Sequence, residues 1–277
     1  MTLFTRCAEQ IAQSSGLLIA AGAGMGVDSG LPDFRGAEGL WRAYPPLRQA
    51  GLRFEEIANP RVFARDPGLA WGFYGHRLQS YREVSPHRGF AILREIAARL
   101  PDGAFVFTSN VDGHFQKAGF ADETVWEVHG SIHHLQCATP CSDRIWPAEG
   151  FEPHVDLSTC RQPKPWPGCP DCGGLARPNI LMFGDWNWLE QRTGQQEARF
   201  AAWHRAASNP VVVELGAGKS VATVRMMSER SGFPLIRINL RDPDVPAPDH
   251  IGVPMGALAA LEGIRAALVE MGFLAGP

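Results

Sequence analysis

The sequence of 277 residues lacks several features that mark particular classes of protein. Its longest apolar runs are far too short to cross a bilayer, and its start has no basic region followed by an apolar core. We therefore predict no membrane span and no secretory signal. The 26 Lys and Arg are balanced by 29 Asp and Glu, which gives a net charge of −3. Without an excess of positive charge, we expect neither direct nucleic-acid binding nor attraction to an anionic membrane.

Cysteine is scarce, but four of the six cysteines form two closely spaced pairs in a proline-rich segment. The pairs are Cys137-x3-Cys141 and Cys169-x2-Cys172. Two such pairs of thiolates can close a tetrahedral Zn²⁺ site, and four protein ligands leave no position for water. The spacing therefore predicts one structural zinc ion.

Alternatives remain open for this segment. The four cysteines could be unrelated buried side chains, or Cys160 could replace one of them as a ligand, with His133 and His134 as spare ligands. Cys7, on the apolar face of the first predicted helix, is expected in the core. Cysteines paired in this way favour a metal over disulfides and hence a reducing compartment, so we expect a cytoplasmic protein.

Apolar segments of strand length alternate with segments of helical periodicity. Strands are predicted at 17–21, 104–108, 124–128, 180–183, 210–216 and 234–239, the last of these being the final strand. Helices are predicted at 3–13, 67–84, 86–100, 190–208, 219–230 and 258–271. This alternation is typical of an α/β fold, a Rossmann-like parallel sheet with helices on both faces.

Two segments interrupt this alternation and look like insertions. We predict a Rossmann-like domain of residues 1–35, 89–130 and 180–277, a helical insertion at 36–88 and a small zinc-binding module at 131–179.

A glycine turn follows the first predicted strand. Gly22, Gly24 and Gly26 would let the backbone approach a phosphate, with N–H groups directed at the anion. The common dinucleotide fingerprint requires a third glycine three positions after the second, but that position is Val27. The turn is therefore a nucleotide site of another kind, or it serves tight packing. The loop that follows contains Asp33-Phe34-Arg35 and would act as a lid, although one arginine can also be a surface ion-pair partner.

Polar residues follow two further strands, where open α/β sheets bind ligands. Ser109-Asn110-Val111-Asp112 comes after the strand at 104–108, and His129 comes after the strand at 124–128. A histidine titrates near neutrality and can act as a general base, although most histidines are structural. Asn110 and Asp112 could bind an amide or ribose hydroxyls, or simply form a turn.

In chain order these motifs resemble the sirtuins, a family of NAD-dependent protein deacylases. The resemblance rests on Gly22-Ala23-Gly24, Ser29-Gly-Leu-Pro-Asp-Phe-Arg35-Gly, Ser109-Asn-Val-Asp112-Gly, His129-Gly130, the cysteine pairs and Phe183-Gly184-Asp185. It extends from about Gly16 to Asn239, and residues 22–41 are its most specific part.

The resemblance implies a site for NAD and a reaction. The implied NAD-binding residues are Gly22, Ala23, Gly24, Asp33, Phe34, Arg35, Ser109, Asn110, Val111, Asp112, His129, Gly216, Ala217, Gly218 and Asn239. Asn110 and His129 would be catalytic, with His129 as general base. In this family the acyl oxygen of a modified lysine attacks the nicotinamide ribose, nicotinamide leaves, and the acyl group passes to ADP-ribose. The expected partner is an acylated protein or peptide, bound in part by Phe183 and Gly184, and the zinc ion would be structural.

Tyr74-Gly-His-Arg77 resembles the Tyr-x-x-Arg pair of sirtuins that remove succinyl or malonyl groups. A phenol and a guanidinium can bind an acyl chain that ends in a carboxylate. The alternative is an ordinary helix face with a tyrosine and an arginine.

The sequence departs from the family pattern at four places. Ser109 replaces a glutamine, His114-Phe115 replaces Leu-His, and Gly216-Ala217-Gly218 replaces Gly-Thr-Ser. Asp185-Trp186-Asn187-Trp188 replaces the Glu-x-Leu-Pro segment that pairs with the substrate peptide by strand addition. This last change bears on the peptide more than on NAD.

Three functions follow from these observations. The first is an NAD-dependent lysine deacylase, acting as a deacetylase or on succinyl or malonyl groups. The second is an NAD glycohydrolase or ADP-ribosyltransferase on the same scaffold, suggested by Ser109 and the changed segment at 185–188. The third is a non-catalytic NAD-binding module, which the presence of Asp112 and His129 disfavours.

Overall fold

A computed structural model describes residues 2–32 and 36–276. Its centre is a six-stranded sheet in the order β3-β2-β1-β7-β8-β9, in which all neighbouring strands run parallel. The strands are β1 (Gly16–Ala21), β2 (Ala104–Thr108), β3 (Val125–Glu127), β7 (Pro210–Leu215), β8 (Leu235–Ile238) and β9 (Ile251–Val253). The predicted α/β fold with a parallel sheet is confirmed.

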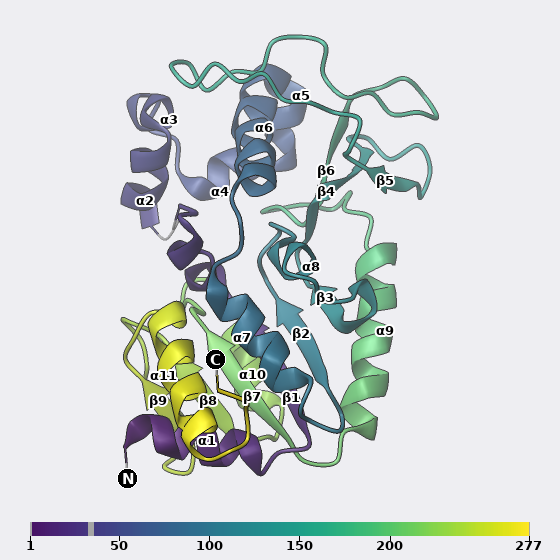
Figure 1. The fold of residues 1–277 in the computed structure, drawn as a ribbon. Helices are drawn as coiled ribbons and strands as arrows, with labels where there is room; N and C mark the ends of the chain where they lie inside the picture. Colours follow the sequence, from purple (N-terminus) through teal and green to yellow (C-terminus); the bar gives the residue numbers. More distant parts are fainter. Residues whose placement is uncertain (1, 33–35, 277) are drawn as a thin grey trace.

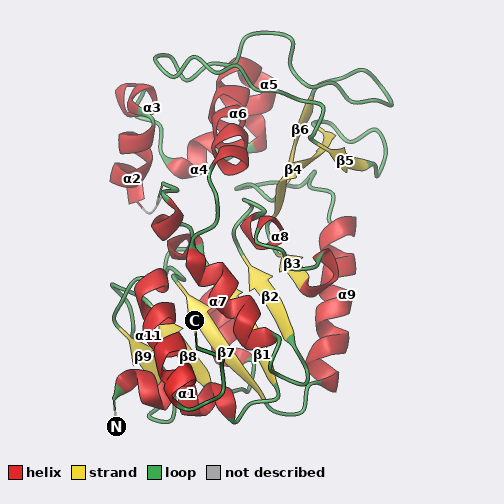
Figure 2. Ribbon diagram, in the orientation of Figure 1, coloured by secondary structure: helices red, strands yellow, loops and turns green. Residues whose placement is uncertain are grey.

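Helices cover both faces of this sheet (Figures 1 and 2). They are α1 (Leu3–Ala12), α7 (Arg88–Ala97) and α11 (Ala257–Glu270) on one face, with α9 (Gln191–Ala206) and α10 (Thr223–Arg230) on the other. Side chains of β1 alternate between the two cores: Leu17 and Ile19 pack with the first group, and Leu18 packs with the second. Because both faces are covered, β1 is a continuous apolar run, the pattern expected of a parallel strand.

A second part of the molecule stands above the carboxyl ends of these strands (Figure 1). Its helices are α2 (Gly36–Ala43), α3 (Pro45–Gln49), α4 (Phe54–Ile57), α5 (Pro60–Arg65) and α6 (Pro67–Glu83), and a short α8 (His114–Lys117) follows β2. Its antiparallel sheet, in the order β5-β4-β6, consists of β5 (Ile145–Pro147), β4 (Gly130–Cys137) and β6 (Ala176–Ile180).

The helices and the antiparallel sheet of this second part share one hydrophobic core. Trp71 and Tyr74 of α6 pack in the same cluster as Leu135 of β4 and Ile180 of β6. The indole N–H of Trp71 also donates to the carbonyl oxygen of Ala176 over 3.1 Å. The three-part division predicted from the sequence stays a prediction, since a shared core does not fix its boundaries.

Four strands differ from the prediction. The strand predicted at 180–183 is β6, which lies earlier, at Ala176–Ile180. Its start was missed because its middle residues Arg177 and Asn179 are polar and are buried with polar partners. The eight-residue β4, the short β5 and β9, whose three residues contain a glycine, were not predicted. The final strand is therefore β9 and not the segment at 234–239.

Two helices begin later than predicted. The helix predicted at 86–100 begins at Arg88, because the His87 side chain accepts the Gly89 N–H as the N-cap. The helix predicted at 219–230 begins only at Thr223.

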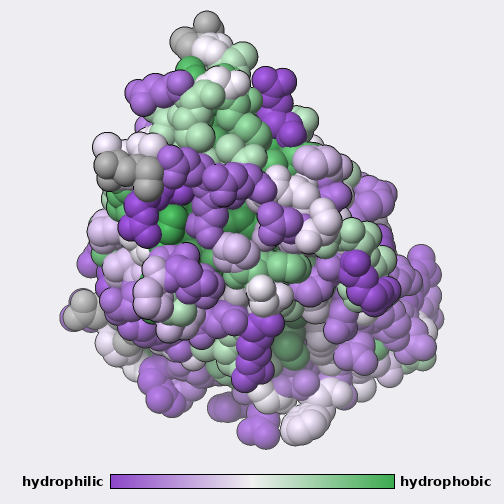
Figure 3. All heavy atoms as spheres, turned by 90° about the horizontal axis from the view of Figure 1, so that it is seen from below, coloured by the Kyte–Doolittle hydropathy of each residue, from purple (hydrophilic) through white to green (hydrophobic). Residues whose placement is uncertain are grey.

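Among the described residues, no helix has both the length and the apolar character that spanning a bilayer requires. Seen from below, hydrophilic residues cover much of the surface and hydrophobic ones form small areas between them (Figure 3).

Candidate active site

A cavity of about 850 Å³ lies at the carboxyl ends of the parallel strands, beneath the helical part of the molecule. Predicted site residues on its walls are Gly22, Ala23, Tyr74, Arg77, Ser109, Asn110, Val111, Asp112, His129, Phe183 and Gly218. The fold thus brings together residues that are far apart in the sequence.

The remaining predicted residues are not on the described walls. The lining residues do not include Gly24, Gly216, Ala217 or Asn239, nor Gly184, which follows Phe183. The predictions for Asp33, Phe34 and Arg35 fall outside the described residues.

The two glycine turns pack against each other. The N–H of Gly22 donates to the carbonyl oxygen of Leu215 over 2.9 Å, and that of Gly24 donates to Gly216 over 3.1 Å. A Cβ atom on Gly216, whose φ is +60°, would lie 2.4 Å from the Cα atom of Gly24. Tight packing therefore explains these two glycines, while Gly22 and Gly218 also face the cavity.

The polar residues after β2 are fixed by the backbone around them. The amide nitrogen of the Asn110 side chain donates to the carbonyl oxygen of Gly22 over 3.0 Å, which ties the end of β2 to the glycine turn. The N–H of Ser109 donates to the carbonyl oxygen of Ala21, and the carbonyl oxygen of Val111 accepts the N–H of Ile132. These bonds hold the 109–111 segment against the neighbouring strands.

Asp112 is a buried carboxylate on the cavity wall. It accepts the N–H of His114 over 2.9 Å, and its carbonyl oxygen accepts a hydrogen bond from His133 Nε2 over 2.8 Å. Burial raises the pKa of the Asp112 carboxyl, opposed by its hydrogen bond from His114.

His129 lies in the turn between β3 and β4, partly buried on the cavity wall. Its carbonyl oxygen accepts the N–H of Leu181 over 2.9 Å. The next residue, Gly130, has φ +77°, and a Cβ atom there would lie 2.1 Å from the carbonyl oxygen of Asn179. Burial lowers the pKa of His129, opposed by a hydrogen bond with the Ser109 backbone. The ring is therefore neutral at pH 7 and able to accept a proton.

Arg77 is a buried cation that α6 contributes to the cavity wall. Its Nε and Nη2 donate to the hydroxyl of Tyr81 over 3.1 and 2.9 Å. Its guanidinium also lies 5.2, 5.8 and 5.5 Å from the ring centroids of Phe73, Tyr74 and Tyr81. Burial raises the pKa of Tyr74 to about 12 and also raises that of Tyr81, so both hydroxyls stay protonated.

Tyr81 was not predicted as a site residue. It stands four residues after Arg77 on α6, and this spacing places it on the same helix face. The i, i+4 spacing in the sequence could therefore have indicated Tyr81 as a site residue.

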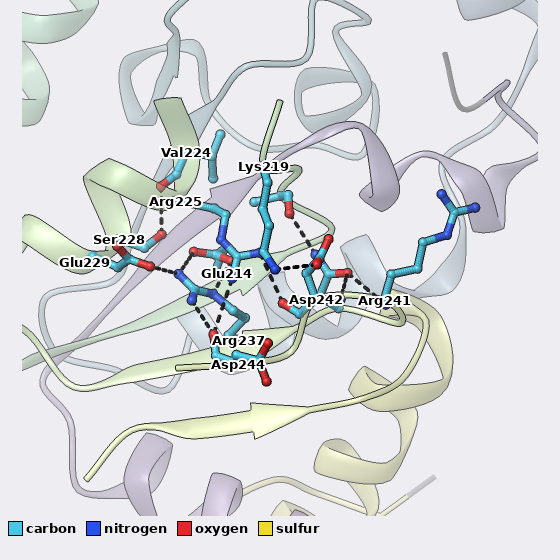
Figure 4. Close-up of polar contacts among 12 residues, drawn as sticks. Glu214, Lys219, Val224, Arg225, Ser228, Glu229, Arg237, Arg241, Asp242 and Asp244 are labelled. Atoms are coloured by element: carbon cyan, nitrogen blue, oxygen red, sulfur yellow. Dashed lines mark hydrogen bonds and ion pairs between the residues drawn. The ribbon is translucent and has the colours of Figure 1, made fainter. Parts of the chain in front are cut away.

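The sequence reasoning also missed the residues at the far end of the cavity, Lys219, Ser220, Arg241 and Asp242. Figure 4 shows Lys219 directed at Asp242, and the two form an ion pair of 2.6 Å. Asn239 holds this end from behind: its side chain donates to Ala217 over 2.7 Å and accepts the N–H groups of Arg241 and Asp242.

Two arginines fix the loop that carries Arg241 and Asp242 (Figure 4). Arg225 donates to the carbonyl oxygen of Asp242 over 3.1 Å, and Arg237 donates to that of Asp244 over 2.5 Å. Arg237 is itself buried against the carboxylate of Glu214, at 2.6 and 2.9 Å. A network of buried charge therefore shapes this wall.

The four paired cysteines converge at the end of β4. The Sγ atoms of Cys137 and Cys172 are 3.8 Å apart and those of Cys141 and Cys169 are 3.6 Å apart, and all four lie within 4.8 Å of one another. Sulfur atoms around a tetrahedral zinc with Zn–S bonds of about 2.3 Å lie about 3.8 Å apart. The residues are thus positioned to bind one structural zinc ion. The alternative of four unrelated cysteines is wrong.

The other two cysteines lie outside this cluster. Cys7 is buried in the core beside α11, as predicted, and burial raises its pKa to about 11. Cys160 is buried against α6, where its carbonyl oxygen would be 2.0 Å from a Cβ atom on Gly72.

A model of the Sir2 family matches residues 22–217, which is more than half of the chain. The chain belongs to the Sir2 family. A protein of Pyrococcus furiosus named NAD-dependent protein deacylase is 37% identical over 175 residues, 63% of each chain. A protein of the same name from Aeropyrum pernix is 30% identical over 232 residues, 83% of this chain and 82% of the relative. The chain thus spans less than two thirds of the first of these relatives.

Solved Sir2 structures have the same fold over nearly the whole chain. A Sir2 homologue in complex with NAD has a TM-score of 0.71 at 26% identity, covering 97% of this chain and 94% of the other. An ADP-ribose complex of a mutant Sir2 homologue has a TM-score of 0.70 at 27% identity, covering 96% and 97%. The sirtuin resemblance identified in the sequence is confirmed.

Proposed function

We propose that this Sir2-family protein is an NAD-dependent protein-lysine deacylase that prefers acyl groups ending in a carboxylate. The observation that carries the proposal is the shared cavity, whose walls contain buried Arg77 together with His129 and Asn110. A site for an acidic acyl chain and a site for a nucleotide thus open into one space. An acylated protein or peptide is the partner we propose, and nucleic acid is not.

The nucleotide side has the residues that NAD requires. When bound, NAD supplies an electrophilic ribose carbon and accepts the acyl group. Asn110 and Asp112 present an amide and a carboxylate beside the glycine turn, suited to ribose hydroxyls and a carboxamide. His129 is neutral because burial lowers its pKa, and it would take the proton from a ribose hydroxyl.

The acyl side is suited to negative charge. A guanidinium surrounded by aromatic rings binds a carboxylate strongly because little water competes for either group. The hydroxyls of Tyr74 and Tyr81 stay protonated and can donate to the same carboxylate. An acetyl group offers these residues no charge to bind.

A panel of acyl-lysine peptides with NAD, read out as nicotinamide release, tests the proposal. We expect release only with an acyl-lysine present, faster with succinyl- or malonyl-lysine than with acetyl-lysine, and slowed by about 100-fold or more in His129→Ala. Arg77→Met should remove the preference for the acidic chains. Equal NAD cleavage with and without any acyl-lysine would contradict the proposal.

A second function is favoured by the segment after Phe183. Asp185 forms a buried ion pair with Arg177, and Trp186 is 95% exposed. The segment that usually binds the peptide in this family is therefore changed. An NAD glycohydrolase or ADP-ribosyltransferase would then use water or another acceptor. A gain of ADP-ribose on a target protein, instead of loss of an acyl group, would identify it.

The two short cysteine pairs support one further proposal, a cytoplasmic location. Paired thiols stay reduced and able to bind metal in a reducing compartment. Fractionation of cells that express the tagged protein tests it.

A further inference from the structure

β3, the strand that leads to His129, is an edge strand of the parallel sheet. On its inner side it pairs with β2, and Val128 N–H donates to the carbonyl oxygen of Thr108 over 3.0 Å. Within the described residues no strand pairs with its outer side, and α9 lies alongside instead (Figure 1). An edge strand leaves alternate N–H and C=O groups without a partner, so something must bind the outward groups of Glu127.

Side chains of α9 bind Glu127 at three points. Gln196 Oε1 accepts its N–H over 3.1 Å, and the Thr193 hydroxyl donates to its carbonyl oxygen over 3.3 Å. Arg192 Nη2 forms an ion pair of 2.5 Å with its carboxylate. Glu127, Thr193 and Gln196 are all buried. The side chains of a helix thus take the place of the missing neighbouring strand.

The helix that supplies these contacts is itself fixed to the sheet. Phe200 lies 5.4, 6.3 and 5.2 Å from the ring centroids of Phe105, Phe107 and Trp126. These aromatic contacts come from β2 and β3, so α9 and the sheet form one packed unit. The first turns of α9 are therefore a rigid support for the end of β3.

His129 follows Glu127 by two residues, and its carbonyl oxygen accepts the N–H of Leu181, the residue after β6. We infer that Arg192, Thr193 and Gln196 are positioning residues that hold the imidazole of His129 at the reaction centre by fixing the end of β3. This inference rests on the proposed function, in which His129 takes a proton. Displacing a catalytic group by about 1 Å can cost about 100-fold in rate, so a small shift of this turn would be measurable.

The test compares Gln196→Met with Gln195→Met. Both replace a glutamine of α9 by a side chain of similar length, but Gln196 is buried against Glu127 and its neighbour is exposed. We expect Gln196→Met to lower kcat about tenfold or more with little change in KM for NAD, and Gln195→Met to leave kcat unchanged. Equal kcat for the two variants would overturn the inference.

A second comparison tests whether the contacts act through His129. Arg192→Met should lower kcat and Arg192→Lys should restore most of it, because the lysine keeps the charge beside Glu127. In a His129→Ala background, Gln196→Met should cause no further loss. An equal loss in both backgrounds would show that Gln196 acts independently of His129 and would overturn the inference.

A measurement without turnover separates this inference from the proposed function. The His129 ring signal, assigned by its loss in His129→Ala, is followed by NMR against pH in wild type and in each glutamine variant. We expect the His129 pKa to rise towards its ordinary value in Gln196→Met alone, because a loosened turn admits water. If wild type cleaves no acyl-lysine yet this pKa moves, the proposed function fails and the positioning role stands. If the His129 pKa and the His129 ring signal are both unchanged in Gln196→Met, the inferred positioning role is wrong.

Discussion

The carboxylate of Asp185 accepts two hydrogen bonds from the guanidinium of Arg177, over 2.7 and 2.9 Å, and neither side chain is exposed. Asp185 also accepts the N–H of Asn187 over 3.1 Å. The turn after Phe183 is therefore built on a buried ion pair. Within this turn, the side chain of Trp186 is exposed to solvent.

Breaking this ion pair should cost much of the stability of the second part of the molecule. Asp185→Asn leaves the Arg177 cation buried beside a neutral amide, and such a loss costs about 3–5 kcal/mol of unfolding free energy. Arg53→Met, which breaks the exposed pair with Glu56, should cost less than about 1 kcal/mol. Denaturant unfolding measures both, and similar midpoints for the two variants would contradict the prediction.

Zinc binding should depend on four of the six cysteines. Cys169→Ser removes one of four ligands, so metal analysis of the purified protein should fall from one zinc per chain to well below one. The same change at Cys160, which is buried outside the cluster, should leave one zinc bound. Loss of zinc from Cys160→Ser would show that the ligand set differs from the cluster in the structure.

The activity should have an acid limit set by His129. Only the neutral imidazole can accept a proton, and burial lowers the pKa of this ring below its ordinary value of 6.5. The base therefore stays active as the pH falls past 6.5, and kcat/KM should decline only below that pH. A pH profile of kcat/KM measures this limit. An acid limit above pH 6.5 would mean that another group controls the rate.

Gly130→Ala should be severely destabilising. The substitution places a Cβ atom 2.1 Å from the carbonyl oxygen of Asn179 at a φ of +77°. Left-handed backbone alone costs about 1–2 kcal/mol for a residue with a side chain, and the overlap adds to it. Gly150→Ala, at a site with nothing within 4 Å, is the matched control and should change unfolding little. Thermal unfolding compares the two, and equal melting temperatures would refute the prediction.

Tyr81→Phe should weaken binding of acidic acyl groups. The change removes the hydroxyl that accepts from Arg77, so the guanidinium loses its fixed orientation. A hydrogen bond to a charged group is worth about 1.5–3 kcal/mol, which corresponds to a rise in KM of about tenfold or more for a succinyl-lysine peptide. KM for the acetyl-lysine peptide serves as the internal control and should change less than about twofold. An equal rise for both peptides would show a general loss of structure.

The motifs that identify the family are readable in the sequence because each is local. A buried strand followed by glycines, or two cysteines a few residues apart, has a pattern set by the geometry of one turn. The sheet was predicted for the same reason: β1 is apolar on both faces, and β7 contains the apolar run 211–213.

The position of β6 could not be predicted in this way because the strand contains buried polar residues. Arg177 and Asn179 are buried in the strand because Asp185 and Gln136 bind them, and neither partner can be inferred from spacing. The support of Glu127 by Gln196 depends likewise on which helix faces which strand.

The sequence by itself determined the fold class, the zinc ligands and the family, since these depend on contacts within short segments or on a fixed order of motifs. Only the tertiary structure decided how these parts meet. It packed Gly24 against Gly216, placed Arg77 and His129 on the walls of one cavity, and turned α9 into the support of an edge strand. Such contacts join residues that are remote in the chain, and they form only when the cores on the two faces of the sheet are complete.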